Sequence, residues 1–353
     1  MDLPDWRPLQ AMPRICGAPL GQATMRQSAD DFRVDEVLGF EPDGDGEHVL
    51  LHLRKRDTNT NWLAGQLARF AGIPSREVSY AGLKDRHAVT SQWFSLRLAG
   101  KPEPDWSALD SERVELLAVH RHRRKLRRGA LRGNRFLILL RGVTGDPQDL
   151  DQRLQRLRRE GMPNYFGEQR FGHDYRNLSR FDELLGDGVR RRIDRHLRGL
   201  LISAVRSQLF NEVLAARIER DCWSTPLPGD YFMLDGSRSG FADDPADSRL
   251  AERCRSLDIH PSGPLWGRGT PPVSGETAEL EQSVLAPFAL WRERLEHLGL
   301  EQERRALRLR LDDLEWTFEP EAGALRLGFF LPAGAFATVL LRELFEISSP
   351  AAV

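Results

Sequence analysis

Strand-like alternation occurs near both ends of the chain, and a long helical pattern separates the two regions. Near the N-terminus, "DDFRVDEVLGFE" and "HVLLHLRKR" alternate apolar with polar residues on either side of the acidic turn "PDGDGE". Alternation returns at Leu307, Leu309 and Leu311, and a turn over 319–323 then predicts an antiparallel hairpin. The intervening "RIDRHLRGLLISAVRSQLFNEVLAARIER" has helical periodicity. We therefore predict an α+β fold in which both ends of the chain build one domain.

Length favours the same organisation. The chain has 353 residues, and domains built around a single hydrophobic core are usually shorter. We predict one domain over 1–159 plus 309–353, interrupted by a mostly helical insertion over 160–308. A helix over 149–160 leads to the junction, and a second predicted helix follows a cap at Thr60 or Asn61.

Composition excludes several classes of protein. The formal net charge is -1, so only local patches can attract nucleic acid or an acidic partner. No apolar run approaches membrane-spanning length and the first residues do not resemble a signal peptide, so we expect a cytoplasmic protein without membrane contact. The three cysteines are too widely spaced for a disulfide framework or a zinc site.

One basic run stands out in this charge-balanced chain. From Arg121 to Arg135 there are eight Lys or Arg residues and no acidic residue. Such a run is either a solvated loop or a surface that binds a polyanion such as RNA, and the run alone leaves both open. The apolar "NRFLILLR" that follows predicts a buried strand that would hold it.

The stretch "AGLKDRHAVTSQW" contains the strongest candidate for chemistry. Asp85 lies between Lys84 and Arg86, after a small-residue turn and before a predicted strand. A solvated turn has the same composition, but a carboxylate flanked by cations can also act as a nucleophile or a base. No phosphate-binding loop, metal-ligand spacing or nucleophile elbow accompanies it, so we expect no metal and no cofactor.

Five separated motifs resemble one family. "AGLKDRHAVTSQW", "KLRRGALRGNRF", "PNYFGEQRFG", "SAVRSQLFN" and "FLPAGAFATVLLREL" occur in the order typical of the tRNA pseudouridine synthase D family, and the similarity covers nearly the whole chain. The resemblance implies a catalytic domain with a mixed, mainly antiparallel sheet flanked by helices, and an insertion specific to the family. It also implies isomerisation of a uridine, at position 13 of tRNA, to pseudouridine without a cofactor.

The resemblance also implies roles for particular residues. Asp85 corresponds to the nucleophile of the family, Phe32 and Phe336 to aromatic residues of the uracil site, and Asn134 to its polar contact, with Phe136 alongside. For contact with the RNA backbone we predict a set of basic residues: Lys84, Arg86, Arg123, Arg124, Lys125, Arg127 and Arg128. We expect the insertion to bind parts of the RNA outside the target nucleotide, and residues 190–192 are among its basic residues.

The sequence departs from the family pattern at one position and leaves two other functions open. Arg26 stands where many relatives have Lys, and we assign it no catalytic role because a guanidinium differs from an ammonium in shape and donors. One alternative is a non-catalytic protein that binds or folds tRNA. Another is a glycosidase-like enzyme that pairs Asp85 with Glu36. We expect a monomer.

Overall fold

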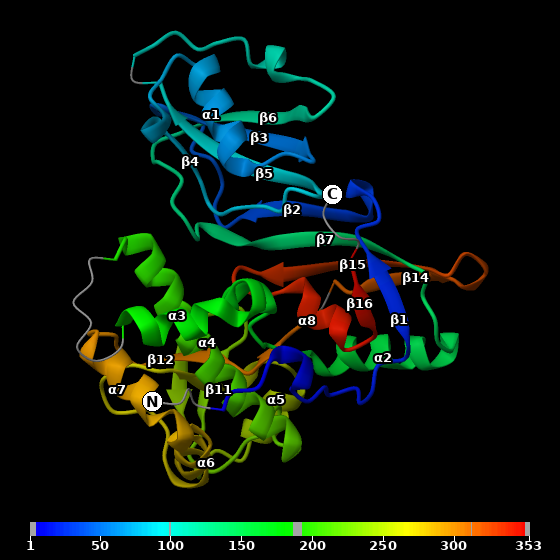
Figure 1. Cartoon of the computed structure of the whole chain (residues 1–353), viewed down its shortest axis with the longest axis vertical. Coiled ribbons are helices and arrows are strands. Elements are labelled where there is room, and N and C mark those ends of the chain that lie inside the picture. The colour runs from blue at the N-terminus through cyan, green and yellow to red at the C-terminus, as the bar shows by residue number, and fades with distance from the viewer. Residues whose placement is uncertain (1–4, 99, 186–192, 312, 350–353) are drawn as a thin grey trace. The chain divides into compact units, whose positions relative to one another are not determined.

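The chain folds into two compact units. The computed structural model describes residues 5–98, 100–185, 193–311 and 313–349, so the basic residues 190–192 lie outside it. The sheet unit comprises Leu20–Leu150, Asp312–Gly334 and Phe345–Val353. The helical unit comprises Met1–Pro19, Asp151–Leu311 and Ala335–Leu344. Figure 1 shows the course of the chain through both.

The compact units and the predicted domains are different divisions of the chain. The predicted insertion, 160–308, falls entirely within the helical unit, but that unit also contains short segments from both ends of the chain. Compactness groups residues by contact and does not define a family domain, so the boundaries at 159 and 309 stay predictions.

A ten-stranded mixed sheet forms the sheet unit, with strand order β14-β15-β7-β2-β5-β3-β6. Strand β1 lies beside β16 and β7, and β4 lies beside β5. The β1–β16 and β2–β5 pairs are parallel and the others are antiparallel. The strands are β1 (Gln22–Met25), β2 (Phe32–Leu38), β3 (His48–Arg56), β4 (Val78–Tyr80), β5 (Val89–Arg97), β6 (Val114–His122), β7 (Leu131–Arg141), β14 (Glu315–Glu319), β15 (Ala324–Pro332) and β16 (Glu346–Ser348).

Strands from the two ends of the chain meet in this sheet. Strand β15 pairs with β7 over nine residues, so the late alternating segment completes a sheet begun near the N-terminus. The predicted hairpin is confirmed: Glu319 pairs with Ala324, and Gly323 takes the left-handed backbone that the turn requires, with φ 54°. The mixed, mainly antiparallel sheet confirms the predicted fold class.

Helix α1 (Thr60–Phe70) covers one face of the sheet, and its N-cap is Asn59, one residue before Thr60, the first of the two predicted caps. The side chain of Asn59 accepts hydrogen bonds from the backbone N–H groups of Asn61 and Trp62, as an N-cap residue does. Thr60 does not cap the helix because its hydroxyl donates to Gln92 on β5, at 3.0 Å. The first turn of α1 is thereby tied to the sheet.

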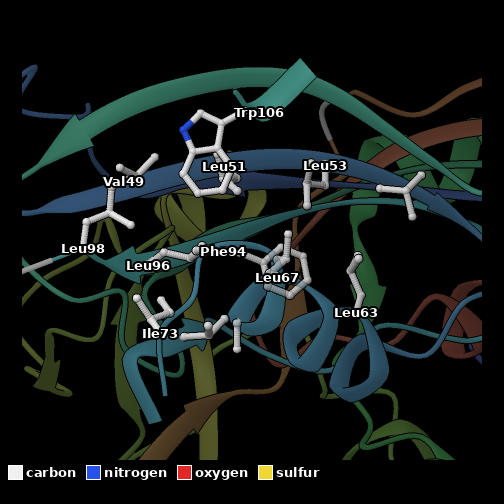
Figure 2. Close-up of a cluster of buried hydrophobic side chains, with 14 residues drawn as sticks. Val49, Leu51, Leu53, Leu63, Leu67, Ile73, Phe94, Leu96, Leu98 and Trp106 are labelled. Atoms are coloured by element: carbon white, nitrogen blue, oxygen red, sulfur yellow. The ribbon is translucent and has the colours of Figure 1, made fainter. Parts of the chain in front are cut away.

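A buried apolar cluster joins α1 to the sheet, as Figure 2 shows. Leu63 and Leu67 lie one helical turn apart and pack against alternate residues of β3, including Leu51 and Leu53. Phe94 of β5 belongs to the same cluster and is fully buried. The face of the sheet that carries α1 is therefore the core face at β3 and β5.

Substitution of Leu67 by alanine is expected to lower the free energy of unfolding by about 2–5 kcal/mol, because it leaves a cavity at a residue with no exposed surface. Urea unfolding of the purified protein would measure the loss. Arg69→Ala, at an exposed position of the same helix, is the matched control and should change stability by less than about 0.5 kcal/mol. Equal losses in the two variants would contradict this assignment of the core.

The helical unit combines helices with a small antiparallel sheet of order β10-β9-β11-β12. Its helices are α2 (Pro147–Glu160, which begins in the sheet unit), α3 (Arg176–Leu185), α4 (Arg195–Glu219), α5 (Leu250–Arg255), α6 (Gly275–Leu285), α7 (Ala289–His297) and α8 (Ala337–Arg342). Its strands are β8 (Met162–Pro163), β9 (Tyr231–Leu234), β10 (Gly240–Ala242), β11 (Ile259–Leu265), β12 (Glu303–Ala306) and β13 (Arg308–Leu309). Across the described residues, no helix has the length and apolar character needed to cross a membrane.

Candidate active site

Asp85 lies on the loop between β4 and β5, and a buried lysine holds the backbone of this loop. The Nζ atom of Lys55, on β3, donates to the carbonyl oxygen of Asp85 at 2.9 Å and to that of Thr58 at 2.6 Å. Lys55 has no exposed surface. Burial lowers the pKa of Lys55 to about 8, although the nearby carboxylate of Asp85 opposes the change.

Two further side chains fix the loop on the N-terminal side of Asp85. The hydroxyl of Thr60 accepts a hydrogen bond from the backbone N–H of Lys84, at 3.1 Å. The amide of Gln92 donates to the carbonyl of Gly82 at 2.6 Å. Thr60 and Gln92 are buried and bonded to each other. The loop is therefore attached to β3, β5 and the start of α1, so the backbone at Asp85 has a defined position.

Arg26 contacts the Asp85 carboxylate directly. Its Nη2 lies 2.6 Å from Oδ2, and the two side chains are 23% and 34% exposed. The guanidinium lies 4.0 Å from the ring centroid of Phe32, so a cation–π contact also orients it. Arg26 has φ 62°, a left-handed backbone that is uncommon outside glycine and concentrates at functional sites. The sequence assigned Arg26 no catalytic role, whereas the structure makes it a side-chain partner of Asp85.

Lys84, the residue before Asp85, points away from bulk water. Its Nζ lies 2.7 Å from Oε1 of Glu36 and 2.9 Å from Oδ1 of Asn134, and the side chain is only 9% exposed. Glu36 also accepts a hydrogen bond from the backbone N–H of Trp93, at 2.9 Å. Burial raises the pKa of the Glu36 carboxyl, and the charge of Lys84 opposes the rise. In this arrangement the ammonium of Lys84 is directed at Glu36 and Asn134 and has little exposed surface.

The strand register places the side chains of Lys55, Asn134 and Phe136 on one face of the sheet, the face that carries α1. Phe136 is paired with Val34, Val34 with Thr90, and Thr90 with Lys55, so the four form one row across four strands. Side chains two residues apart on a strand share a face. Asn134, two residues before Phe136, therefore lies on this same face.

The two predicted aromatic residues of the sheet unit are core residues in this structure. Phe32 is 2% exposed and Phe136 is 8% exposed. Their rings meet edge to face with centroids 6.1 Å apart, and Phe136 stacks on Phe329 at 5.2 Å. Stacking of a uracil on Phe32 would require Arg26 to leave the ring face that it covers. Their predicted contact with substrate stays a prediction.

Phe336 belongs to the helical unit. There its ring meets Phe166 edge to face, with centroids 6.2 Å apart, and lies 5.8 Å from the guanidinium of Arg170. A Cβ atom at Gly167 would come within 2.9 Å of the Phe336 ring, so the glycine allows this ring to approach the backbone. The motif "NYFGEQRF" thus forms a packing surface for Phe336.

The predicted basic surface is only partly available. Arg123 forms an exposed ion pair with Asp45 at 2.7 Å, and Lys125 donates to the carbonyl of Arg76. Within the described part of the chain, the remaining exposed members have no ion pair: Arg86, Arg124, Arg127 and Arg128. These four are the best placed of the set to meet phosphates.

Matches to known proteins define the class of this chain. A model of the tRNA pseudouridine synthase D (TruD) family matches residues 15–181 and 187–344. The tRNA pseudouridine synthase D of Methylococcus capsulatus is 52% identical over 97% of this chain and 96% of its own length. That of Nitrosococcus oceani is 52% identical over 92% of this chain and 91% of its own. The class is therefore that of the pseudouridine synthases, which are isomerases.

Within that class, the chain belongs to the tRNA pseudouridine synthase D family, as the five sequence motifs predict. A solved structure described as TruD from Methanosarcina mazei has the same fold, with a TM-score of 0.71 over 98% of each chain. Its sequence is 22% identical to this one, so the comparison supports the fold alone.

Proposed function

We propose that this protein converts a uridine of tRNA, at position 13, to pseudouridine, with Asp85 as the nucleophile. The observation that carries the proposal is the partly exposed carboxylate of Asp85 on a fixed loop. The backbone carbonyl of Asp85 accepts a hydrogen bond from buried Lys55. Membership of the family supports the reaction. Action on cellular tRNA fits the cytoplasmic location that the sequence predicts. For the oligomeric state we propose a monomer.

The reaction needs a carboxylate but no redox partner. The bond from N1 of uracil to C1′ of the ribose breaks, the base turns within the site, and C5 bonds to C1′. The proton on C5 is lost and N1 gains one, so the product is an isomer of the substrate. Asp85 can attack C1′ to give a covalent acylal that C5 then displaces. Alternatively it can stabilise positive charge at C1′ and take the proton from C2′, which gives a glycal, and return that proton to C2′ as C5 bonds to C1′. Both routes place the carboxylate beside C1′.

Arg26 has a defined part in this proposal. Its guanidinium donates to Oδ2 of Asp85 at 2.6 Å and so helps to orient the carboxylate that would meet the sugar. The guanidinium also lies over the Phe32 ring, 4.0 Å from its centroid, so this cation–π contact helps to orient it. A target base must leave its stack in the RNA before C1′ can reach Asp85.

For the substrate we keep the predicted contacts and revise one of them. Phe32, Asn134, Phe136 and Phe336 remain the proposed residues of the uracil site. Arg86 and the exposed members of the basic run remain proposed phosphate contacts, because lysine and arginine release counterions from RNA on binding. Lys84 is better placed as a support for Asn134 than as a phosphate contact.

The geometry favours this function over the glycosidase-like alternative. That alternative requires Glu36 as a second catalytic carboxyl, facing the sugar with Asp85. The side chain of Glu36 has no exposed surface and is engaged by Lys84 and the backbone of Trp93. A carboxyl held in this way has no access to a glycosidic oxygen.

A defined reaction tests the proposal. Unmodified tRNA transcript would be incubated with the purified protein in buffer without added cofactor, and each uridine would then be mapped for pseudouridine. Pseudouridine at position 13 is the expected result. Salt-sensitive tRNA binding without any pseudouridine would favour the non-catalytic alternative, and release of free uracil would favour a glycosidase.

A further inference from the structure

The ammonium of Lys84 bridges a buried carboxylate and a side-chain amide. Glu36 and Asn134 are directly paired on neighbouring strands β2 and β7, so their side chains stand next to each other on one face of the sheet. Lys84 reaches both from the Asp85 loop, at 2.7 Å and 2.9 Å. With Glu36 fully buried and Lys84 only 9% exposed, water competes little for either contact.

This bridge determines which end of the Asn134 amide faces Lys84. An ammonium group has three donors and no acceptor, so it can contact only the oxygen of the amide. Rotating the amide by half a turn would place Nδ2 against Nζ, where two donors would meet. Nδ2 is therefore directed away from Lys84, and within the described residues it has no protein acceptor. A fixed donor thus lies next to the loop that carries Asp85.

We propose that Lys84 is a positioning residue that makes the site select uracil, by locking the Asn134 amide with its N–H donors toward the base. The proposal rests on the proposed function, because it concerns the base that this site would hold. At position 4 uracil has a carbonyl acceptor, whereas cytosine has an amino donor. A locked N–H at position 4 bonds to uracil and opposes cytosine.

Glu36 has a separate part, which is to keep Lys84 in place. Without its carboxylate charge, a buried ammonium would lack a counter-ion. The single amide oxygen of a glutamine could still face Lys84, although the backbone N–H of Trp93 would then lose its acceptor. Glu36→Gln should therefore preserve the orientation of Asn134, whereas Lys84→Met should release it.

Replacing single oxygens of the target uracil by sulfur provides the test, because a thiocarbonyl is a weaker acceptor. Single-turnover pseudouridine formation would be measured on tRNA with uridine, 4-thiouridine or 2-thiouridine at the target. With wild-type protein, 4-thiouridine should react about tenfold more slowly than uridine, as expected for a weakened hydrogen bond. The 2-thio substrate is the control and should react within about twofold of uridine.

The variants then separate the proposal from general damage. Lys84→Met should react slowly with every substrate but lose the preference, with 4-thiouridine and uridine within about twofold. Lys101→Met, at an exposed lysine of the same unit, and Glu36→Gln should keep the tenfold preference. An undiminished preference in Lys84→Met, or no 4-thio effect in the wild type, would overturn the proposal. Absence of any pseudouridine with wild-type protein would instead count against the proposed function.

If Lys84→Met does not fold, a double variant allows the same measurement. That variant leaves the Glu36 carboxylate buried without its cation, which can be strongly destabilising. The double variant Glu36→Gln/Lys84→Met removes both charges together, and it should show the same lost preference. A retained preference in the double variant would also overturn the proposal.

Discussion

Asp85→Asn is expected to lower pseudouridine formation by at least about 10³-fold, the scale on which loss of a catalytic nucleophile acts. Asparagine has almost the same size and keeps an oxygen that can accept from Arg26, so the loop should retain its fold. An amide nitrogen, however, cannot attack C1′ or carry the negative charge that stabilises it. The variant should bind tRNA with close to wild-type affinity while it forms no measurable product.

The control for this prediction lies close to the same loop. Asp57 is an exposed aspartate with φ 46°, a backbone conformation that asparagine also adopts readily. Asp57→Asn makes the same chemical change and should keep activity within about twofold. Single-turnover rates, tRNA affinity and thermal unfolding would be measured for both variants. Substantial pseudouridine formation by a folded Asp85→Asn protein would exclude Asp85 as nucleophile.

The sequence predicted the strands of the sheet unit well because their signals are local. The hairpin over 319–323 has alternating residues on both sides of a turn, and a helix such as α4 has a long apolar stripe. The helical unit was less accessible to prediction. The segment "IHPSGPL" is rich in Pro and Gly, a composition that favours a turn or loop, yet Ile259–Leu265 is strand β11. A Cβ at Gly263 would come within 2.9 Å of Leu307 and 3.0 Å of Phe210 of α4, so glycine suits this close packing, which no local pattern reveals.

The site was predicted in part, and the missing part consists of long-range polar contacts. Asp85 and Asn134 lie in motifs that could be recognised, but Arg26 is 59 residues from Asp85 in the chain and its contact depends on the fold. Alternation along β3 indicates that Lys55 is on the face of Leu51 and Leu53. A lysine at such a position signals a buried charge with a special partner, and this signal could have been used.

Long-range polar contacts also explain why the charge pattern of the sequence is a poor guide to the exposed charge. Lys84 belongs to an obviously charged triplet, which suggested phosphate contact, but its side chain is only 9% exposed and forms an ion pair with Glu36. The run from Arg121 to Arg135 has no acidic residue in sequence, yet Asp45 neutralises Arg123 in space. Local charge density therefore overstates the surface potential whenever acidic partners arrive from other strands.

Lys55→Met is expected to slow pseudouridine formation by about 10- to 100-fold with little change in tRNA affinity. Methionine has similar length and cannot donate, so the carbonyls of Asp85 and Thr58 would both lose their donor. Displacement of a nucleophile by about 1 Å can cost about 10²-fold in rate. Lys101→Met is the exposed control and should react at the wild-type rate. Equal rates for the two variants would show that the loop keeps Asp85 in position without Lys55.

The pH dependence distinguishes a positioning role of Lys55 from a merely structural one. Its pKa is lowered to about 8 in the folded protein, chiefly by burial, from an ordinary value of 10.5. The rate should therefore fall as pH rises through about 8, because the ammonium beside the Asp85 loop loses its charge. Over the same range the unfolded chain binds the proton more tightly, so deprotonation of Lys55 raises the free energy of unfolding with pH. Activity would fall while this contribution to stability grows, and unfolding could not account for the loss. Single-turnover rates and urea unfolding from pH 7 to 10 would test both trends. Lys55→Met should lack the step near pH 8, and a step that persists in that variant would assign it to another group.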